Sequence, residues 1–334
     1  RPQVAYSYLK QALALGEEAA DRRVIGYACT WLAMTCGILT RYGEGIAHGE
    51  RAQAIAQSMP EDHYLYFKSL AMIGFNYTSM GEAAKTAAVG RRLLEYGEET
   101  SNPRSLLWAH QTIARGHAAA GDIQAALKSS EMAVNVSKDP FYLLSVEAEH
   151  EMYGVIAGKD PSKLERVRER FRSLGVEGFA NRMGGIVGFG KFNQGRMAEG
   201  MKLIEECSRR SLENGDQQTH LFNENMKGRV YLQMVIGARP RLGMVLKNLG
   251  FLLAHRPFAG RRAQTLIGKA ARVYTEVGAY GSQAQALLNL GLLHRAKKRK
   301  EKARECLAEA ERLFERASAG GFLQRTRDAM AQLK

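Results

Sequence analysis

The sequence predicts an all-α protein, a right-handed superhelical α-solenoid of about seven helical hairpins. Two observations predict this class. A pattern of large apolar, small and turn-forming residues recurs along the chain at helical spacing. Alanine, the strongest helix former, is abundant, whereas the 334 residues include only 7 prolines. A third observation is the lack of any apolar run of about 18 residues, so no membrane-spanning helix is expected.

The clearest hairpin begins at Leu70. Leu70, Ile73 and Tyr77 share one helix face, and Gly74 leaves a notch in that face where a neighbouring backbone can approach. Gly81 ends this first helix, and an alanine-rich second helix follows it. Such a hairpin must bury its apolar face on another hairpin, which predicts an array.

Two more hairpins with the same pattern flank this one. They are expected at 25–57 and 103–133, the first closed by Pro60 and the second opened by Pro103. A lone helix at 3–21 comes before them and has the place of a second helix whose first helix is missing. Because the sequence also begins with neither an initiator Met nor a signal peptide, it is expected to be a fragment of a longer protein.

The rest of residues 1–334 is expected to continue the same single solenoid with less regular units. In chain order these are an irregular unit at 142–174, a bend near 175–180, a hairpin at 184–207, an irregular stretch at 217–277, a hairpin at 287–310 and a capping helix at 322–333. Within the second irregular stretch, helices are expected at 219–236, 241–255 and 262–277, divided by Ala238–Pro240 and by Arg256–Phe258.

These hairpins resemble the tetratricopeptide repeat (TPR), a helix-turn-helix unit of about 34 residues with small and large apolar residues at fixed places. The best matches run from Leu70 to Gly81 and from Leu287 to His294. The usual tryptophan is absent, so the resemblance is to a divergent array. It implies a non-catalytic scaffold that binds a protein or peptide on its concave face. The array is also similar to the C-terminal helical regions of bacterial STAND- or AAA-type signalling ATPases and to cyclase-associated TPR proteins, which implies a sensor arm in signal transduction.

Charge and cysteine content leave several partners open. The formal net charge is +14, which permits nucleic acid, acidic proteins or an anionic membrane surface as partners and does not choose among them. The 4 cysteines lie in helical patterns without metal-ligand spacing, so they are expected to be free thiols in a reducing cytoplasm. The sequence contains no paired carboxylates, metal cluster or cofactor motif that would indicate an enzyme, and the fragment is expected to need no cofactor.

Three basic or glycine-rich stretches look functional at first sight. Residues 185–191 match the start of a phosphate-binding loop, but Phe192 stands where the loop needs Ser or Thr, so the glycines are read as packing residues. The run Lys297–Lys302 is expected in a solvated turn between two helices. The alternate arginines of 166–172 are expected to split between opposite helix faces.

Functional residues are expected on the concave face, which in such arrays is lined by first-helix residues that do not pack inside their own hairpin. The positions transferred in this way are Tyr27, Met34, Lys68, Phe75, Trp108, Gln111, Arg115, Arg182, Phe189, Phe192 and Asn193. Aromatic rings beside lysine and arginine suit an acidic peptide. The alternative is a basic solenoid that binds RNA or DNA through Lys297–Lys302 and its arginine-rich helices, with a steep loss of affinity as salt rises.

Overall fold

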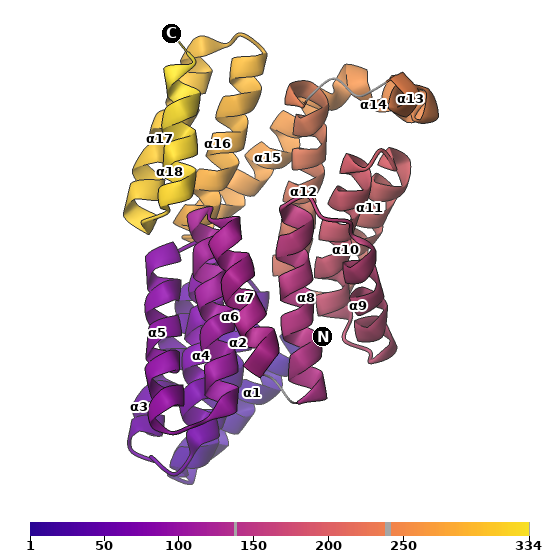
Figure 1. The fold of residues 1–334 in the computed structure, drawn as a ribbon. Coiled ribbons are helices and arrows are strands. Elements are labelled where there is room, and N and C mark those ends of the chain that lie inside the picture. The colour runs from indigo at the N-terminus through magenta and orange to yellow at the C-terminus, as the bar shows by residue number, and fades with distance from the viewer. Residues whose placement is uncertain (137–138, 238–241, 334) are drawn as a thin grey trace. The chain divides into compact units, whose positions relative to one another are not determined.

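The computed structural model describes residues 1–136, 139–237 and 242–333, and within these ranges the chain is a succession of helices without a strand (Figure 1). Consecutive helices pack on one another, which confirms the predicted all-α solenoid. The chain divides into two compact units. Unit 1 comprises residues 1–150, 214–218 and 277–279, and unit 2 comprises residues 151–213, 219–276 and 280–334.

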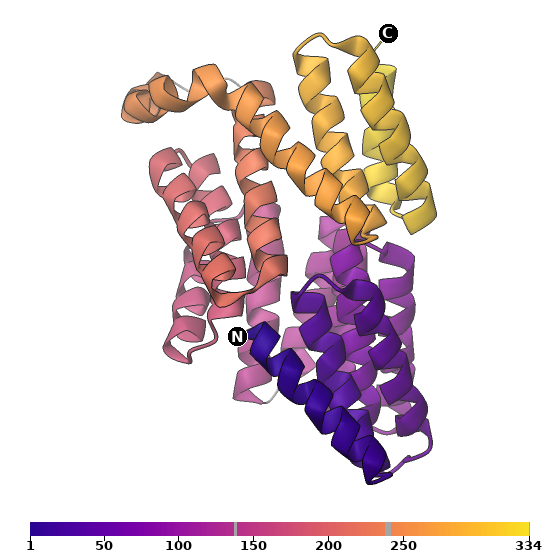
Figure 2. The same cartoon turned by 180° about the vertical axis from the view of Figure 1, so that it is seen from behind.

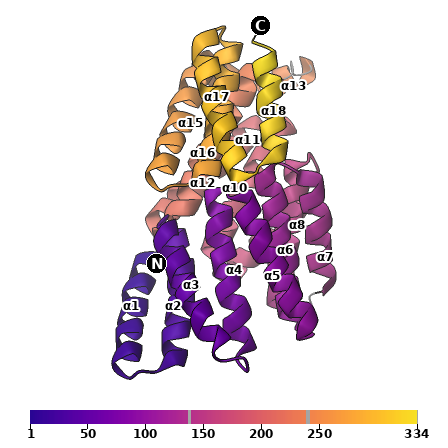
Figure 3. The ribbon, with the colours of Figure 1, turned by 90° about the vertical axis from the view of Figure 1, so that its left-hand side faces the viewer.

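Unit 1 is built of consecutive helical hairpins (Figure 3). Its helices are α1 (Pro2–Glu18), α2 (Arg22–Ile38), α3 (Tyr42–Gln57), α4 (His63–Met80), α5 (Ala83–Glu99), α6 (Pro103–Ala120), α7 (Ile123–Val136) and the first part of α8 (Pro140–Ile156). The first helices of successive hairpins, α2, α4 and α6, also contact one another. Tyr142 of α8 contacts Trp108 of α6 and so continues this series. We call α2, α4, α6 and the unit 1 part of α8 the first-helix row.

Local chemistry explains where the hairpins of unit 1 turn. Gly81 ends α4 and Gly121 ends α6 with φ of +76° and +88°, a left-handed conformation that costs glycine little. The predicted notch at Gly74 is filled by a side chain instead of a backbone, because a Cβ added there would lie 2.9 Å from Thr112 Cγ2. Leu70 is fully buried beside it, as its place in the pattern predicts.

Unit 2 contains the remaining helices, and Figure 2 shows α15 in orange leading into the last three in lighter orange and yellow. They are the end of α8, α9 (Ser162–Ser173), α10 (Glu177–Asn193), α11 (Met197–Asn214), α12 (Gln217–Ile236), α13 (Leu242–Lys247), α14 (Leu249–His255), the 3₁₀ helix η1 (Arg256–Phe258), α15 (Ala259–Glu276), α16 (Tyr280–Ala296), α17 (Lys300–Ala317) and α18 (Gly320–Ala331). The last hairpin and its capping helix lie where the sequence predicts them. Of all the helices within the described ranges, none is both long enough and apolar enough to cross a membrane.

The helix predicted at 241–255 is wrong as a single element, because it is split between α13 and α14 at Asn248. The Asn248 side chain is needed elsewhere: its Nδ2 donates to the Gly195 carbonyl oxygen at 2.8 Å, and its Oδ1 accepts from the Met197 backbone N–H at 3.2 Å. Asn248 thus uses its side chain to cap the turn between α10 and α11, and α13 ends at the residue before it. The predicted division at Ala238–Pro240 and the predicted start at Arg241 lie outside the described residues.

Candidate functional site

The first-helix row of unit 1 places a lysine between two tryptophans. Lys68 on α4 lies with its Nζ 4.3 Å from the ring centroid of Trp108 on α6 and 5.2 Å from that of Trp31 on α2. The chain contains only 2 tryptophans, and both are in this arrangement. A cation above an indole face is attracted by the negative face of the ring. We call Trp31, Lys68 and Trp108 the lysine–indole cluster.

Lys68 is buried without a carboxylate. Lys68 is only 6% exposed. Among the residues that the structure describes, none forms a hydrogen bond or an ion pair with its ammonium group. Burial, with a smaller contribution from the positive charge of Arg115, lowers the pKa of Lys68 from 10.5 to about 8. The ammonium is still the main form at neutral pH, and its counter-charge is missing.

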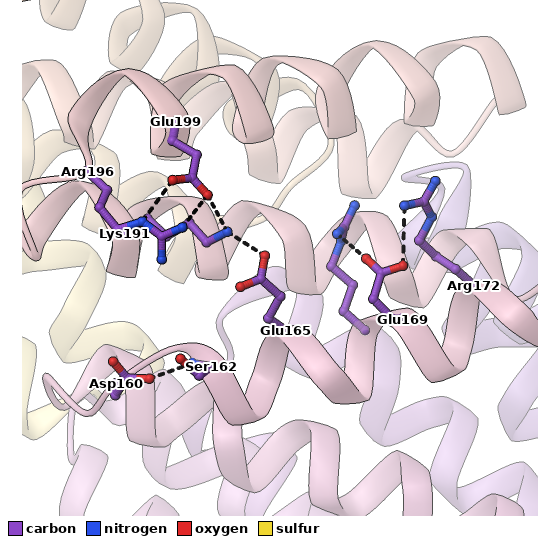
Figure 4. A network of polar contacts seen from close by, with 9 residues as sticks. Asp160, Ser162, Glu165, Glu169, Arg172, Lys191, Arg196 and Glu199 are labelled. Atoms are coloured by element: carbon purple, nitrogen blue, oxygen red, sulfur yellow. Dashed lines mark hydrogen bonds and ion pairs between the residues drawn. The ribbon is translucent and has the colours of Figure 1, made fainter.

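A second buried lysine shows how the same fold neutralises such a charge when the residue is structural (Figure 4). Lys191 on α10 is 4% exposed, and its Nζ donates to carboxylate oxygens of Glu165 and Glu199, the latter at 2.7 Å. Glu199 is in turn bound by Arg196, whose Nη2 lies 2.6 Å from its Oε1. Because α10 is a continuous helix here, Lys191 belongs to an ion-pair network and not to a phosphate-binding loop.

Polar atoms near the lysine–indole cluster are also left without partners. Trp108 Nε1 and Gln111 Oε1 are both buried and make no hydrogen bond with the described part of the chain. An indole N–H can only donate and an amide oxygen can only accept, so the first needs an acceptor and the second needs a donor. Buried groups of this kind are uncommon in folded proteins unless water or a ligand completes them.

Arg115 is already engaged by a carboxylate. Its Nε and Nη2 donate to Glu149 Oε1 and Oε2 at 2.8 and 3.0 Å, and both side chains are nearly buried. The guanidinium carbon also lies 5.9 Å from the ring centroid of Trp108. Arg115 therefore positions the indole that Lys68 contacts, and its charge is balanced by α8.

Sequence reasoning missed Trp31 and Glu149, which complete this site. Trp31 lies on α2, one hairpin before Lys68, at a position outside the predicted set. The signal available in the sequence was the tryptophan itself, since Trp31 and Trp108 occur one repeat before and one repeat after Lys68. Glu149 had no such signal, because Glu147 and Glu151 flank it at similar spacing.

The other predicted residues of unit 1 pack between neighbouring helices. Tyr27 donates its hydroxyl to Asp62 at 3.0 Å, and its ring stacks on Tyr64. Phe75 fills the space beside Gly37, where an added Cβ would lie 2.5 Å from its ring. Met34 is half-buried against the same core. The structure therefore gathers Lys68, Trp108, Gln111 and Arg115, and it uses the remaining three mainly for packing.

The predicted residues of unit 2 lie in two different places. Arg182 lies 4.8 Å above the ring of Phe222, and Phe189 receives Arg229 at 5.1 Å, so both belong to contacts between α10 and α12. The remaining two lie apart from these contacts at the end of α10, where Phe192 is buried with its ring 6.3 Å from that of Phe251 and Asn193 is exposed.

The two basic stretches also lie as predicted. Lys297–Lys302 covers the turn between α16 and α17, where Lys298 has a left-handed φ of +57°. Arg168 is 5% exposed, whereas Arg166 and Arg170 are exposed, which confirms that the arginines of 166–172 split between helix faces.

One group in unit 1 has the composition of a metal site. Ligand atoms of Cys36, Glu44 and His48 lie within 4.8 Å of one another. Burial and the Glu44 charge raise the pKa of the Cys36 thiol to about 12, so the sulfur is protonated and a poor ligand. Tyr6 donates its hydroxyl to Glu44 at 2.6 Å. Glu44 thus already has partners on α1 and α3, in Tyr6 and His48.

Compared with protein-family models and with curated protein sequences, the chain matches neither, so the chemistry of these side chains is the guide to its function.

Proposed function

We propose that the chain is a non-catalytic protein-interaction scaffold of the TPR type, and that it binds an acidic peptide or protein segment on the first-helix row of unit 1. In the cell it would serve as the sensor arm of a bacterial cytoplasmic signalling protein. The single observation that carries the proposal is Lys68, a buried ammonium whose carboxylate partner is missing from the described chain.

The energetics favour a partner for this lysine. Removing a charge from water costs on the order of several kcal/mol unless an opposite charge replaces the lost hydration. The cation–π contacts with Trp31 and Trp108 return about 2 kcal/mol or less each. A carboxylate from a bound peptide would supply the rest, and the two indoles would bury against its apolar neighbours. Tryptophan is among the residues that most often dominate binding energy at interfaces.

The two tryptophans make the experiment direct. We would select peptides from a random library on the full chain and measure the affinity of the winners by intrinsic tryptophan fluorescence. We expect enrichment of Asp and Glu and a fluorescence change on binding, since both indoles contact Lys68. K68M should weaken binding at least tenfold, because it keeps an apolar stem and removes the charge. K128M is the matched control, since Lys128 is an exposed lysine of the same unit on α7.

Either of two outcomes would count against this proposal. One is a set of enriched peptides without acidic residues, and the other is equal binding by the wild type and K68M. A parallel titration with single-stranded RNA covers the nucleic-acid alternative. If RNA binds wild type and K68M with equal affinity, and that affinity falls steeply as salt rises, the function would be assigned to the basic surface instead.

A further inference from the structure

Two arginines of unit 2 are arranged reciprocally across a pair of helices. Arg182 of α10 lies over Phe222 of α12 with its guanidinium carbon 4.8 Å from the ring centroid. About two helical turns further along both helices, Arg229 of α12 lies over Phe189 of α10 at 5.1 Å. Each guanidinium group thus lies over a ring of the facing helix, and Phe189 is itself buried.

Neither guanidinium has a carboxylate partner or a hydrogen bond among the described residues, and each lies over an aromatic ring instead. Other arginines of this unit do form ion pairs with glutamates at 2.6 to 2.8 Å, as in Arg196, Arg209, Arg210, Arg304, Arg312 and Arg327. Arg182 and Arg229 are only half-exposed, so water does not fully replace the missing partners.

A phenol and an amide complete the surroundings of the two arginines. Tyr274 of α15 is 8% exposed, and burial raises the pKa of its hydroxyl to about 12, although both guanidinium charges act in the opposite direction. The phenol is therefore a proton donor at neutral pH. Asn225 of α12 lies beside this phenol, and its Oδ1 is buried without a hydrogen-bond partner in the described chain. Arg325 of α18 adds a third positive charge that acts on Arg229.

We propose that Arg182, Arg229 and Tyr274 form a separate anion site in unit 2 that binds the phosphate group of a small phosphorylated molecule or free phosphate. Two guanidinium groups carry two positive charges and offer planar forks of N–H donors, which match a doubly charged tetrahedral anion. A carboxylate would balance only one of the charges. A metal cation is a poor occupant, because two of the three residues are themselves cations.

This site is independent of the proposed peptide-binding function, since it uses other residues in another unit. Its position suggests a sensor role in which a phosphorylated metabolite sets the state of unit 2. Phe189 and Phe222 would flank the bound group on its apolar sides.

The test is calorimetric titration of the full chain with inorganic phosphate, phenyl phosphate and benzoate at constant ionic strength. We expect both phosphates to bind and benzoate to bind at least tenfold more weakly. Tighter binding of phenyl phosphate than of inorganic phosphate would identify an ester as the ligand, and the reverse order would identify free phosphate. Absence of phosphate binding at millimolar concentration, or equal binding of benzoate, would overturn the proposal.

Variants decide whether these residues hold the anion. R182Q and R229Q should each weaken phosphate binding about 10- to 100-fold, the range for loss of a charged hydrogen bond. R261Q removes the same charge from an exposed position on α15 and should change affinity less than about twofold. Equal weakening by R261Q would indicate non-specific attraction and reject the site. If an arginine variant does not fold, Y274F removes a single oxygen and should still weaken binding severalfold.

The two proposals can fail separately. K68M should leave phosphate binding unchanged, and R229Q should leave binding of the acidic peptide unchanged. Loss of phosphate binding in K68M would contradict a site confined to unit 2, whereas loss of peptide binding alone would bear only on the lysine–indole cluster.

Discussion

Lys68 and Lys191 are buried to nearly the same extent, at 6% and 4% exposed, but have opposite electrostatic surroundings. Lys191 donates to two glutamates, and its charge is part of the packing between α9, α10 and α11. Lys68 faces two indoles and a neighbouring arginine. The same substitution at the two positions should therefore change stability in opposite directions.

We predict that K68M raises the free energy of unfolding at neutral pH by about 1 to 3 kcal/mol, because it removes a charge whose hydration is lost. The free energy of unfolding should also depend on pH, and the two pKa values of Lys68 fix the direction of the change. The pKa of Lys68 is about 8 in the folded chain and 10.5 when unfolded, so between these values the unfolded chain binds more protons. Wild-type stability should therefore rise relative to K68M from about pH 8 to 10.5, by about 3 kcal/mol. Urea unfolding of both chains at several pH values measures the difference, and parallel pH profiles would contradict it.

For K191M we predict the reverse, a loss of about 3 to 5 kcal/mol at neutral pH. The substitution leaves Glu165 and Glu199 facing each other without the ammonium that joins them. The same urea experiment measures this change. The double replacement of Lys191 and Glu165 by Met and Gln should lose less than K191M alone, because it also removes the charge of Glu165, whereas Glu199 stays paired with Arg196. A K191M chain as stable as the wild type would show that the network is dispensable.

At the scale of helices, the backbones of α10 and α11 approach each other closely. A Cβ added at Gly200 would lie 2.3 Å from the Gly188 carbonyl oxygen, and one added at Gly188 would lie 2.6 Å from the Gly200 carbonyl oxygen. Both obstacles are backbone atoms, which cannot move aside as a side chain can. These glycines are therefore required by hairpin packing, as the sequence indicates for the glycine-rich stretch.

We predict that G200A destabilises the chain by about 2 to 4 kcal/mol, since the helices must move apart to admit the methyl group. Gly268 provides the matched control in α15, because a Cβ there meets nothing within 4 Å. G268A should stabilise the chain by about 0.5 to 1 kcal/mol by reducing the freedom of the unfolded chain. Thermal unfolding of the two variants compares them directly, and similar shifts of both in one direction would refute the packing argument.

Sequence periodicity predicts these helices well where one hairpin supplies its own signals. The hairpin at Leu70 carries its apolar face, its notch and its turn glycine within a dozen residues, and all three appear in the structure, although the notch receives the Thr112 side chain instead of a backbone. It fails at Asn248, whose bonds reach a turn about 50 residues earlier. The residues of the two proposed sites also differ in whether the sequence could predict them. Lys68 and Trp108 follow from repeat register, whereas Glu149, Arg229 and Tyr274 depend on contacts between helices that no local pattern records.

At the scale of the whole chain, two compact units each bury a core of their own, and the two tryptophans lie in unit 1 alone. In repeat arrays stability is close to a sum of terms between neighbouring elements, so a local defect affects the nearest elements first. Tryptophan fluorescence therefore reports unit 1, while far-ultraviolet circular dichroism reports helices in both units.

We predict that G200A, a lesion in unit 2, separates these two signals. The circular dichroism transition in urea should broaden and begin at a lower concentration, while the fluorescence midpoint should shift less, because Trp31 and Trp108 remain packed around Lys68. Fluorescence would be excited where tyrosine does not absorb. Gly74, in the lysine-bearing helix α4, supplies the complementary variant: G74V should move the fluorescence midpoint at least as far as the circular dichroism midpoint. Coincident shifts of both signals in both variants would mean that the chain unfolds as one cooperative block, and ligand binding in either unit would then stabilise the whole of it.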